Sequence, residues 1–183
     1  MRIITGSAKG LKLKAPRGLH TRPTADKVKG SIFNILGMRV VDAAVLDLFA
    51  GTGNLGLEAL SRGASKAIFV DNASTVIIKE NAVHTNLLGK SDIYRSDVIR
   101  ALEKLIQQGQ SFDLIFCDPP YNQGCVGQVL GIIDRSALLH STGIMVLEHS
   151  RHESIVYPWK NISIKRSECY GETMVSFFTK KQE

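Results

Sequence analysis

The stretch from Phe49 to Gly56 reads FAGTGNLG and places three glycines in the order G-x-G-x-x-G. Gly51 and Gly53 lack a Cβ atom, so the backbone there can turn sharply and approach a ligand closely. The same spacing, followed about 20 residues later by an acid such as Asp71, is typical of turns that bind dinucleotides. The glycines alone leave two hypotheses open: a nicotinamide-dependent oxidoreductase, or an enzyme with a different adenosine ligand.

Acids near this turn favour the second hypothesis. In a dinucleotide enzyme the pyrophosphate lies against the N-terminus of the next helix, where the carboxylate of Asp47 would repel it. That carboxylate attracts the ammonium and sulfonium groups of S-adenosyl-L-methionine, while Asp71 is placed to accept hydrogen bonds from the ribose hydroxyls. Asp97 would lie near the adenine amino group, and helix capping is its main alternative role. The predicted cofactor-binding residues are Asp47, Phe49, Gly51, Gly53, Asp71 and Asp97.

A second motif, Asp118-Pro119-Pro120-Tyr121, follows the apolar run FDLIFC. Two prolines remove two backbone donors and fix φ, so the rim presents only acceptors, the Asp118 carboxylate and the Pro119 carbonyl. Such acceptors suit the exocyclic amino group of a nucleobase, because they can orient its lone pair and stabilise the charge that develops on nitrogen. Tyr121 would stack on the base. We predict Asp118, Pro119 and Tyr121 as catalytic residues; a proline-rich turn without function is the alternative.

The elements that must position these motifs alternate regularly from residue 44 onward. Apolar runs predict strands at 44–50, 66–71, 91–96, 112–118 and 143–149, with helices near 55–62, 74–88, 98–107 and 125–135. Two further strands at 161–167 and 173–180 predict a closing antiparallel hairpin. The predicted fold class is α/β, an open, doubly wound, mostly parallel sheet, in which ligands bind at the carboxyl ends of the strands.

Basic residues are concentrated at the start of the chain. The 183 residues carry a net charge of +6, yet nine of the 23 Lys and Arg residues fall within residues 1–40, beside a single acid, Asp26. This asymmetry favours a polyanionic partner over a merely solvated face. Residues 1–22 predict a β-hairpin (RIITG and LKLKA) followed by a loop, and a helix extends from Thr24 to about Leu36.

The motifs together resemble class I S-adenosylmethionine-dependent amino-methyltransferases. Five segments narrow the resemblance to the bacterial 16S rRNA guanine-N2 methyltransferase family of the RsmD type: MRIITGSAKGLKLKAP, TRPTADKVKGSIFNIL, VLDLFAGTGNLGLEALSRGA, DLIFCDPPY and YGET. The resemblance covers residues 1 to about 178, and the head segment is its specific part. It implies a Rossmann-like fold, S-adenosyl-L-methionine as cofactor, and methyl transfer to N2 of one guanine, conventionally numbered 966, in 16S rRNA of the small subunit.

The resemblance also divides the chain by role. Residues 1–40 would form a basic extension that contacts RNA, and residues 41–183 the methyltransferase domain. Lys9, Lys12 and Lys14 are expected to meet phosphates, and Arg22 and Thr24 to lie near the site. The family usually has Arg-Glu where this chain has Lys29-Gly30, so any ion pair there is expected to be lost. The acid that ends the second strand is commonly Glu, and here it is Asp71, shorter by one methylene.

Other function classes have less support. An adenine-N6 methyltransferase on DNA or RNA is the nearest alternative, although such enzymes usually carry a target-recognition domain for which this chain has no room. His149-x-x-His152 lacks the third or fourth ligand that zinc requires, so no metal is expected. No apolar run approaches the ~20 residues needed to cross a bilayer. We expect a cytoplasmic monomer with free thiols at its three cysteines.

Overall fold

The computed structural model describes residues 1–15, 23–120, 124–153, 155 and 158–182, with the backbone alone at 23–25. Its elements, in chain order, are α1 (Pro23–Leu36), η1 (Gly37–Val40), β1 (Ala44–Leu48), α2 (Asn54–Ser61), β2 (Lys66–Asp71), α3 (Thr75–His84), η2 (Leu88–Lys90), β3 (Ser91–Arg95), α4 (Val98–Gln107), β4 (Phe112–Cys117), α5 (Cys125–Arg135), β5 (Leu139–Ser150), β6 (Ile162–Tyr170) and β7 (Thr173–Lys180).

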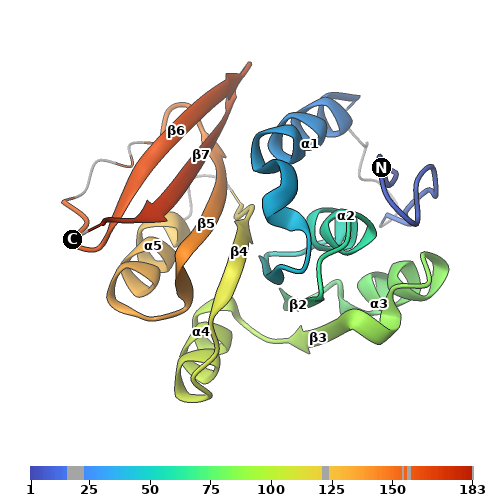
Figure 1. Ribbon diagram of the computed structural model, residues 1–183, viewed down its shortest axis with the longest axis horizontal. Helices are drawn as coiled ribbons and strands as arrows, with labels where there is room; N and C mark the ends of the chain where they lie inside the picture. Colours follow the sequence, from blue (N-terminus) through green and yellow to red (C-terminus); the bar gives the residue numbers. More distant parts are fainter. Residues whose placement is uncertain (16–22, 121–123, 154, 156–157, 183) are drawn as a thin grey trace.

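The strands form one sheet in the order β3-β2-β1-β4-β5-β7-β6 (Figure 1). β1 to β5 run parallel, and β7 inserts antiparallel between β5 and β6. The strand order reverses between β1 and β4, which places the expected ligand crevice at their carboxyl ends. The predicted fold class is confirmed. Element bounds agree closely with the prediction, except that α3 ends earlier than predicted, β5 begins earlier and β6 ends later.

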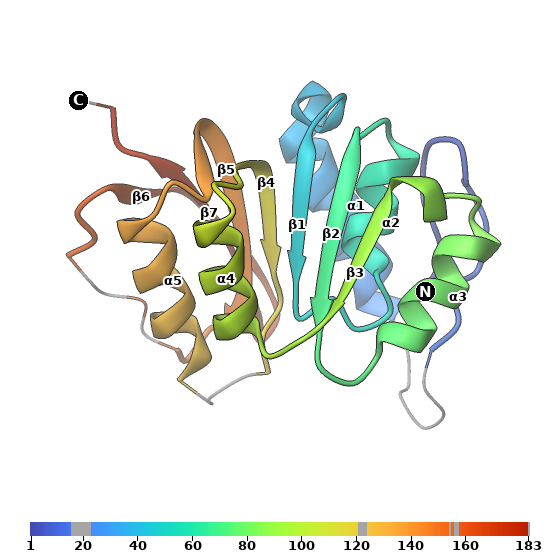
Figure 2. The same cartoon turned by 90° about the horizontal axis from the view of Figure 1, so that it is seen from below.

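Each face of the sheet has its own hydrophobic cluster. One cluster joins strand residues such as Val45 and Phe116 to α1, α2, α3 and the first fifteen residues. The other joins residues of opposite phase, such as Leu46 and Cys117, to α4 and α5. Figure 2 shows α4 and α5 on one side of the strands and α1 and α2 on the other. Because side chains alternate along a strand, the face on which each residue lies follows from its position.

The N-terminal segment is less regular than its sequence predicts. The expected hairpin is formed only in part: an isolated antiparallel bridge joins Arg2 to Lys12, and Ile3 and Leu13 donate backbone hydrogen bonds to Leu11 and Met1. The backbone donors of Ile4 and Thr5 bond instead to the carboxylate of Glu58 on α2, at 2.7 and 3.0 Å. Glu58 on α2 therefore takes the hydrogen bonds of Ile4 and Thr5, and the pairing stops short of two regular strands.

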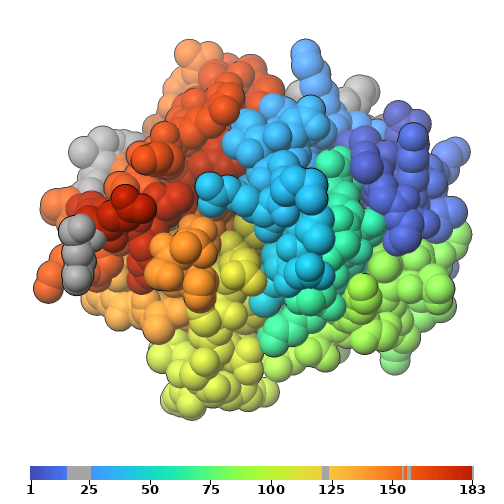
Figure 3. Space-filling model, in the orientation of Figure 1, coloured from blue at the N-terminus to red at the C-terminus, as the bar shows by residue number. Residues whose placement is uncertain are grey.

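This segment, residues 1–15, packs over α2 and α3 beside α1 (dark blue in Figure 3). Ile3 and Leu13 are buried in the same cluster as the sheet. The functional division of the chain at residue 40 stays a prediction, since the two parts share one core. Among the described residues, no helix is long and apolar enough to cross a membrane.

Candidate active site

Four acids come from one face of the sheet. Asp47, Asp71, Asp118 and Glu148 each follow by two positions a residue of the first hydrophobic cluster, namely Val45, Phe69, Phe116 and Val146. A spacing of two keeps a side chain on the same face of a strand. All four acids therefore lie on the face that α1 and α2 cover, at the carboxyl ends of β2, β1, β4 and β5.

A cavity of about 800 Å³ opens on this face. The acids Asp47, Asp118 and Glu148 line its floor. One wall consists of α1 and the chain start, through Met1, Lys27, Val28, Lys29 and Ile32; another is the loop after β1, with Phe49, Ala50, Gly51, Thr52, Asn54 and Leu55; the third is the turn between β6 and β7, from Cys169 to Thr173. Its size is that of a small-molecule site.

Asp47 is the most enclosed acid of the cavity. Its side chain is 2 % exposed, and Oδ2 accepts a hydrogen bond from the backbone N–H of Gly56 at 2.8 Å. Burial raises the pKa of Asp47 to about 7; the Gly56 hydrogen bond opposes this rise and the Asp71 carboxylate adds to it. Because burial destabilises the charged form of this carboxylate, a cationic ligand beside it would be strongly stabilising.

The loop after β1 has the backbone shape that its glycines predict. Gly51 and Gly53 have φ of 56° and 78°, and Phe49, which lacks a glycine's freedom, has φ of 56°. Strained, bulky residues of this kind cluster at ligand sites. Asp71 holds this loop in place, because its Oδ2 accepts a hydrogen bond from the backbone N–H of Gly51 at 2.9 Å. Its Oδ1 accepts from two further backbone donors that follow β2.

Three predicted cofactor residues lie outside the cavity lining. Gly53 is buried behind the loop, and Asp71 supports the loop from β2. Asp97 caps α4, with Oδ1 accepting from Ile99 and Arg100 at 2.9 and 3.2 Å. Helix capping was the alternative role given to Asp97. Both capping bonds are accepted by Oδ1, so only Oδ2 would be available for the predicted contact with the adenine amino group.

The second motif lies beside the first. The backbone N–H of Asp118 donates to the carbonyl of Leu48, at 3.5 Å, where β1 ends. The Asp118 side chain is open to solvent through the cavity, whereas Pro119 is buried. Loss of solvation at the Asp118 carboxyl raises its pKa well above the usual value, and the nearby carboxylates of Glu148 and Asp47 raise it further. Tyr121 lies outside the described residues.

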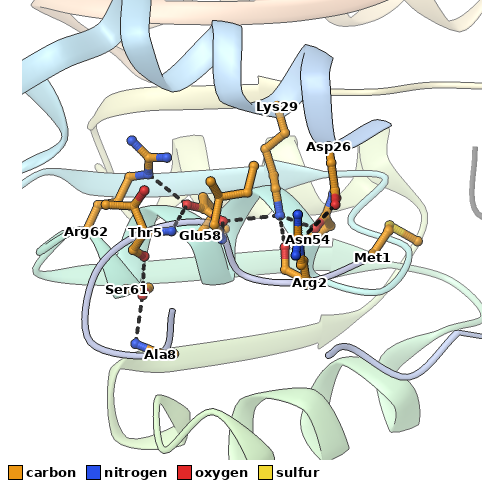
Figure 4. Close-up of polar contacts among 12 residues, drawn as sticks. Met1, Arg2, Thr5, Ala8, Asp26, Lys29, Asn54, Glu58, Ser61 and Arg62 are labelled. Carbon is orange, nitrogen blue, oxygen red and sulfur yellow. Dashed lines mark hydrogen bonds and ion pairs between the residues drawn. The ribbon is translucent and has the colours of Figure 1, made fainter. Parts of the chain in front are cut away.

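Lys29 corrects the expectation that the ion pair on α1 is lost. Its side chain is 1 % exposed, and Nζ lies 3.1 Å from Oε2 of Glu58, which is fully buried (Figure 4). Nζ also donates to Oδ1 of Asn54, the first residue of α2, at 2.7 Å. The partner is supplied by α2 rather than by the helix itself, so the pair was not visible as a local pattern. Arg62 forms a second ion pair with Glu58, with its Nε 2.8 Å from Oε1 of Glu58.

The candidate RNA-binding lysines are on the outer surface of the N-terminal segment. Lys9, Lys12 and Lys14 are exposed, and Lys14 forms an exposed ion pair with Glu80 at 3.0 Å. The buried Lys29, by contrast, does not contribute to the basic surface. Arg22 lies outside the described residues, as does the side chain of Thr24, whose backbone belongs to α1.

One feature of the cavity has no local signal in the sequence. Ser31 on α1 forms a short hydroxyl–hydroxyl hydrogen bond with Tyr170 at the end of β6, so two walls of the cavity are joined. Glu148 and His149, by contrast, end the fifth predicted strand, which favours a place for both along the crevice; Glu148 does line the cavity, because β5 pairs with β4. His149 points away from it and bonds Ser176, and burial lowers its pKa. Among the described residues, no group of His, Cys, Asp or Glu could hold a metal ion.

Comparison with known proteins places the chain in a family. The family model described as "Conserved hypothetical protein 95" matches residues 1–179. The chain belongs to this family. A Bacillus subtilis (strain 168) protein named "Putative rRNA methyltransferase YlbH" is 42% identical over 99% of this chain and 100% of its own length. "Ribosomal RNA small subunit methyltransferase D" of Escherichia coli (strain K12) is 31% identical over 100% of this chain and 91% of its own.

A solved structure agrees with this assignment. "Putative methyltransferase yhhF from Escherichia coli" superposes with a TM-score of 0.85 at 29% identity, over 100% of this chain and 99% of that one. The resemblance to the RsmD-type family and the enzyme class predicted from the sequence, a methyltransferase, are confirmed. The oxidoreductase hypothesis, which depended on the glycine spacing alone, is wrong.

Proposed function

We propose that the protein transfers a methyl group from S-adenosyl-L-methionine to the exocyclic N2 of a guanine in 16S rRNA, at conventional position 966. The observation that carries the proposal is the placement of Asp47 and Asp118 on neighbouring strands of one cavity, beside the loop at Gly51. The relatives named as ribosomal RNA methyltransferases support the choice of ribosomal RNA.

The residues present fit the cofactor. Asp47 offers a carboxylate whose pKa is raised by burial and by the Asp71 carboxylate, and the ammonium or sulfonium of the cofactor would stabilise its charged form. Asp71 and the loop at Gly51 would hold the ribose end, with Asp97 at the adenine. When bound, S-adenosyl-L-methionine supplies an electrophilic methyl group.

The base would be held by acceptors of this chain. Asp118 and the carbonyl of Pro119 would accept the two N–H bonds of the amino group, which orients its lone pair toward the cofactor loop. Positive charge that develops on this nitrogen is stabilised by the Asp118 carboxylate. The raised pKa of Asp118, caused by loss of solvation and by the Glu148 and Asp47 carboxylates, makes its carboxylate a stronger acceptor for the released proton. Tyr121 would stack on the extruded base.

The basic N-terminal surface would bind the RNA backbone. Lys9, Lys12 and Lys14 supply affinity without sequence choice, whereas the cavity selects the amine. We further propose that a cytoplasmic monomer acts on the small ribosomal subunit or an assembly intermediate, and that residues 1–40 serve RNA contact while residues 41–183 serve transfer.

The proposal is tested with Asp118→Ala, assayed on small subunits from a strain that lacks this protein. Methyl transfer should fall by at least about 100-fold, because an acceptor and proton acceptor are both lost, while affinity for S-adenosylhomocysteine is retained. Asp92→Ala, an exposed acid on β3, is the matched control. Nucleoside analysis of the wild-type product should give N2-methylguanosine. N6-methyladenosine would establish the alternative instead, and wild-type turnover in Asp118→Ala would refute the role of Asp118.

A further inference from the structure

Glu148 occupies a defined place beside Asp118. The parallel register of β4 and β5 pairs Cys117 with Leu147, so the next residues along, Asp118 and Glu148, are neighbours across the ~4.8 Å strand spacing. Cys117 and Leu147 both belong to the cluster on the α4–α5 face. Asp118 and Glu148 therefore point to the opposite face, and both line the cavity. The transfer step described above makes no use of Glu148.

Two adjacent carboxylates favour a particular kind of ligand. Like charges on neighbouring strands repel, and the Glu148 carboxylate contributes to the raised pKa of Asp118. A ligand with adjacent N–H donors would relieve this repulsion. The Watson–Crick edge of guanine presents N1–H next to the N2 amino group, whereas adenine presents an N1 lone pair next to its amino group.

We propose that Glu148 accepts the N1–H of the target guanine while Asp118 and the Pro119 carbonyl receive its N2 amino group. Glu148 is then the residue that selects guanine over bases with an unprotonated N1. This inference depends on the proposed function, since it concerns the same base in the same cavity. An adenine placed there would direct its N1 lone pair at the carboxylate, and this unfavourable contact excludes it.

The other acids of the cavity have different surroundings. Asp47 lies under the loop after β1 and bonds the Gly56 N–H. Glu172 is exposed at the turn between β6 and β7 and pairs with His152 at 2.8 Å and Arg151 at 3.6 Å. Among the acids lining the cavity, Glu148 is the one on the strand next to Asp118 in register.

The test compares two bases that share the amino group. Small subunits are reconstituted with 16S rRNA carrying either guanine or 2-aminopurine at position 966; 2-aminopurine keeps the 2-amino group but has an unprotonated N1. Wild-type kcat/KM should favour guanine by at least about 100-fold, because a site built for a donor rejects an analogue that lacks it. In Glu148→Gln the side-chain amide can donate to the unprotonated N1, so the preference should fall at least about tenfold.

Two further variants sharpen the result. Glu148→Asp keeps the carboxylate and should keep the preference for guanine at lower turnover. Glu103→Gln, an exposed acid on α4, should match the wild type. Each preference is a ratio within one preparation, so a partly unfolded fraction cancels. A preference in Glu148→Gln within twofold of the wild type overturns the inference about Glu148. Wild-type protein that methylates no guanine overturns the proposed function itself.

Discussion

Replacing Asp47 with Asn should make the protein more stable and at the same time weaken cofactor binding. The wild-type carboxylate is 2 % exposed, and its pKa rises from 3.8 to about 7 on folding. Asparagine has nearly the same shape and can still accept the hydrogen bond from Gly56. The substitution therefore removes the cost of a buried charge without opening a void.

The size of the effect follows from this shift. One pKa unit corresponds to ~1.36 kcal/mol, so a rise from 3.8 to about 7 makes the ionised group destabilising by about 4 kcal/mol. Because the folded-state pKa is the higher one, folded wild-type protein binds more protons than unfolded protein between pH 4 and 7. Its stability therefore falls as the pH rises through this window. Asp47→Asn lacks this term, so its advantage should grow from near zero at pH 4 to about 4 kcal/mol at pH 8.

Urea denaturation of both proteins from pH 4 to pH 9 measures this difference. The midpoint should rise in the variant at pH 8 with an unchanged slope m, and Tm should rise by roughly 8–16 °C. Other titrating groups are common to both proteins and cancel in the comparison. Asp92→Asn, an exposed acid on β3, is the control and should change stability by less than about 0.5 kcal/mol at any pH.

Calorimetry with S-adenosylhomocysteine supplies the functional half of this prediction. Affinity should fall roughly 10- to 150-fold in Asp47→Asn, which corresponds to losing a hydrogen bond to a charged group worth ~1.5–3 kcal/mol. Wild-type affinity should also weaken below pH 7, because a proton must leave Asp47 before the ammonium binds. A variant that is no more stable than the wild type at pH 8, or an advantage independent of pH, would show that Asp47 does not pay this cost.

Three further substitutions test the packing around the cavity and the RNA-binding surface. Lys29→Met should lower the free energy of unfolding, measured in urea, by about 3 kcal/mol, because Glu58 stays buried without one of its cations. Unchanged stability would contradict this. Gly56→Ala should cost ~1–3 kcal/mol, since a Cβ there would lie 2.3 Å from the ring of Phe69; a stable variant with full cofactor affinity would argue against it. Lys12→Gln should reduce the salt dependence of RNA binding by roughly one phosphate contact in filter-binding titrations, and an equal slope would remove Lys12 from the interface.

Much of the fold was predictable because its signals are local. Apolar runs bounded by glycine and polar residues give β1 to β4 nearly at their observed limits, and the helical spacing of apolar residues gives the end of α1 at Leu36. The hairpin at residues 1–15 is shorter than predicted for a non-local reason. The backbone donors of Ile4 and Thr5 bond Glu58, more than 50 residues away, and alternation of side chains cannot reveal such a partner.

The site residues also differ in whether their signal in the sequence is local. Asp47 and Asp118 were predicted as site residues from the motifs that contain them, and both line one cavity, while their chemical roles stay predictions. Lys29 was expected to lack an ion pair because Gly30 stands where the family usually has Glu, and the acid that pairs with Lys29, Glu58, comes from another helix. Glu148 belongs to no motif: its place at the end of the fifth predicted strand indicates the crevice, but only the register of β5 with β4 shows that it lies beside Asp118.

Strand order also explains why the acids at the strand ends would contact different ligands. β1 lies between β2 and β4, so Asp47 shares its surroundings with Asp71 on one side and Asp118 on the other. The loop after β1 turns over Asp47 toward β2, where Asp71 holds Gly51. Under the proposed function, cofactor contacts would therefore gather over β1 and β2, and base contacts over β4 and β5. It follows that a change on β1 should alter cofactor affinity while base preference stays constant, and a change at Glu148 should do the reverse.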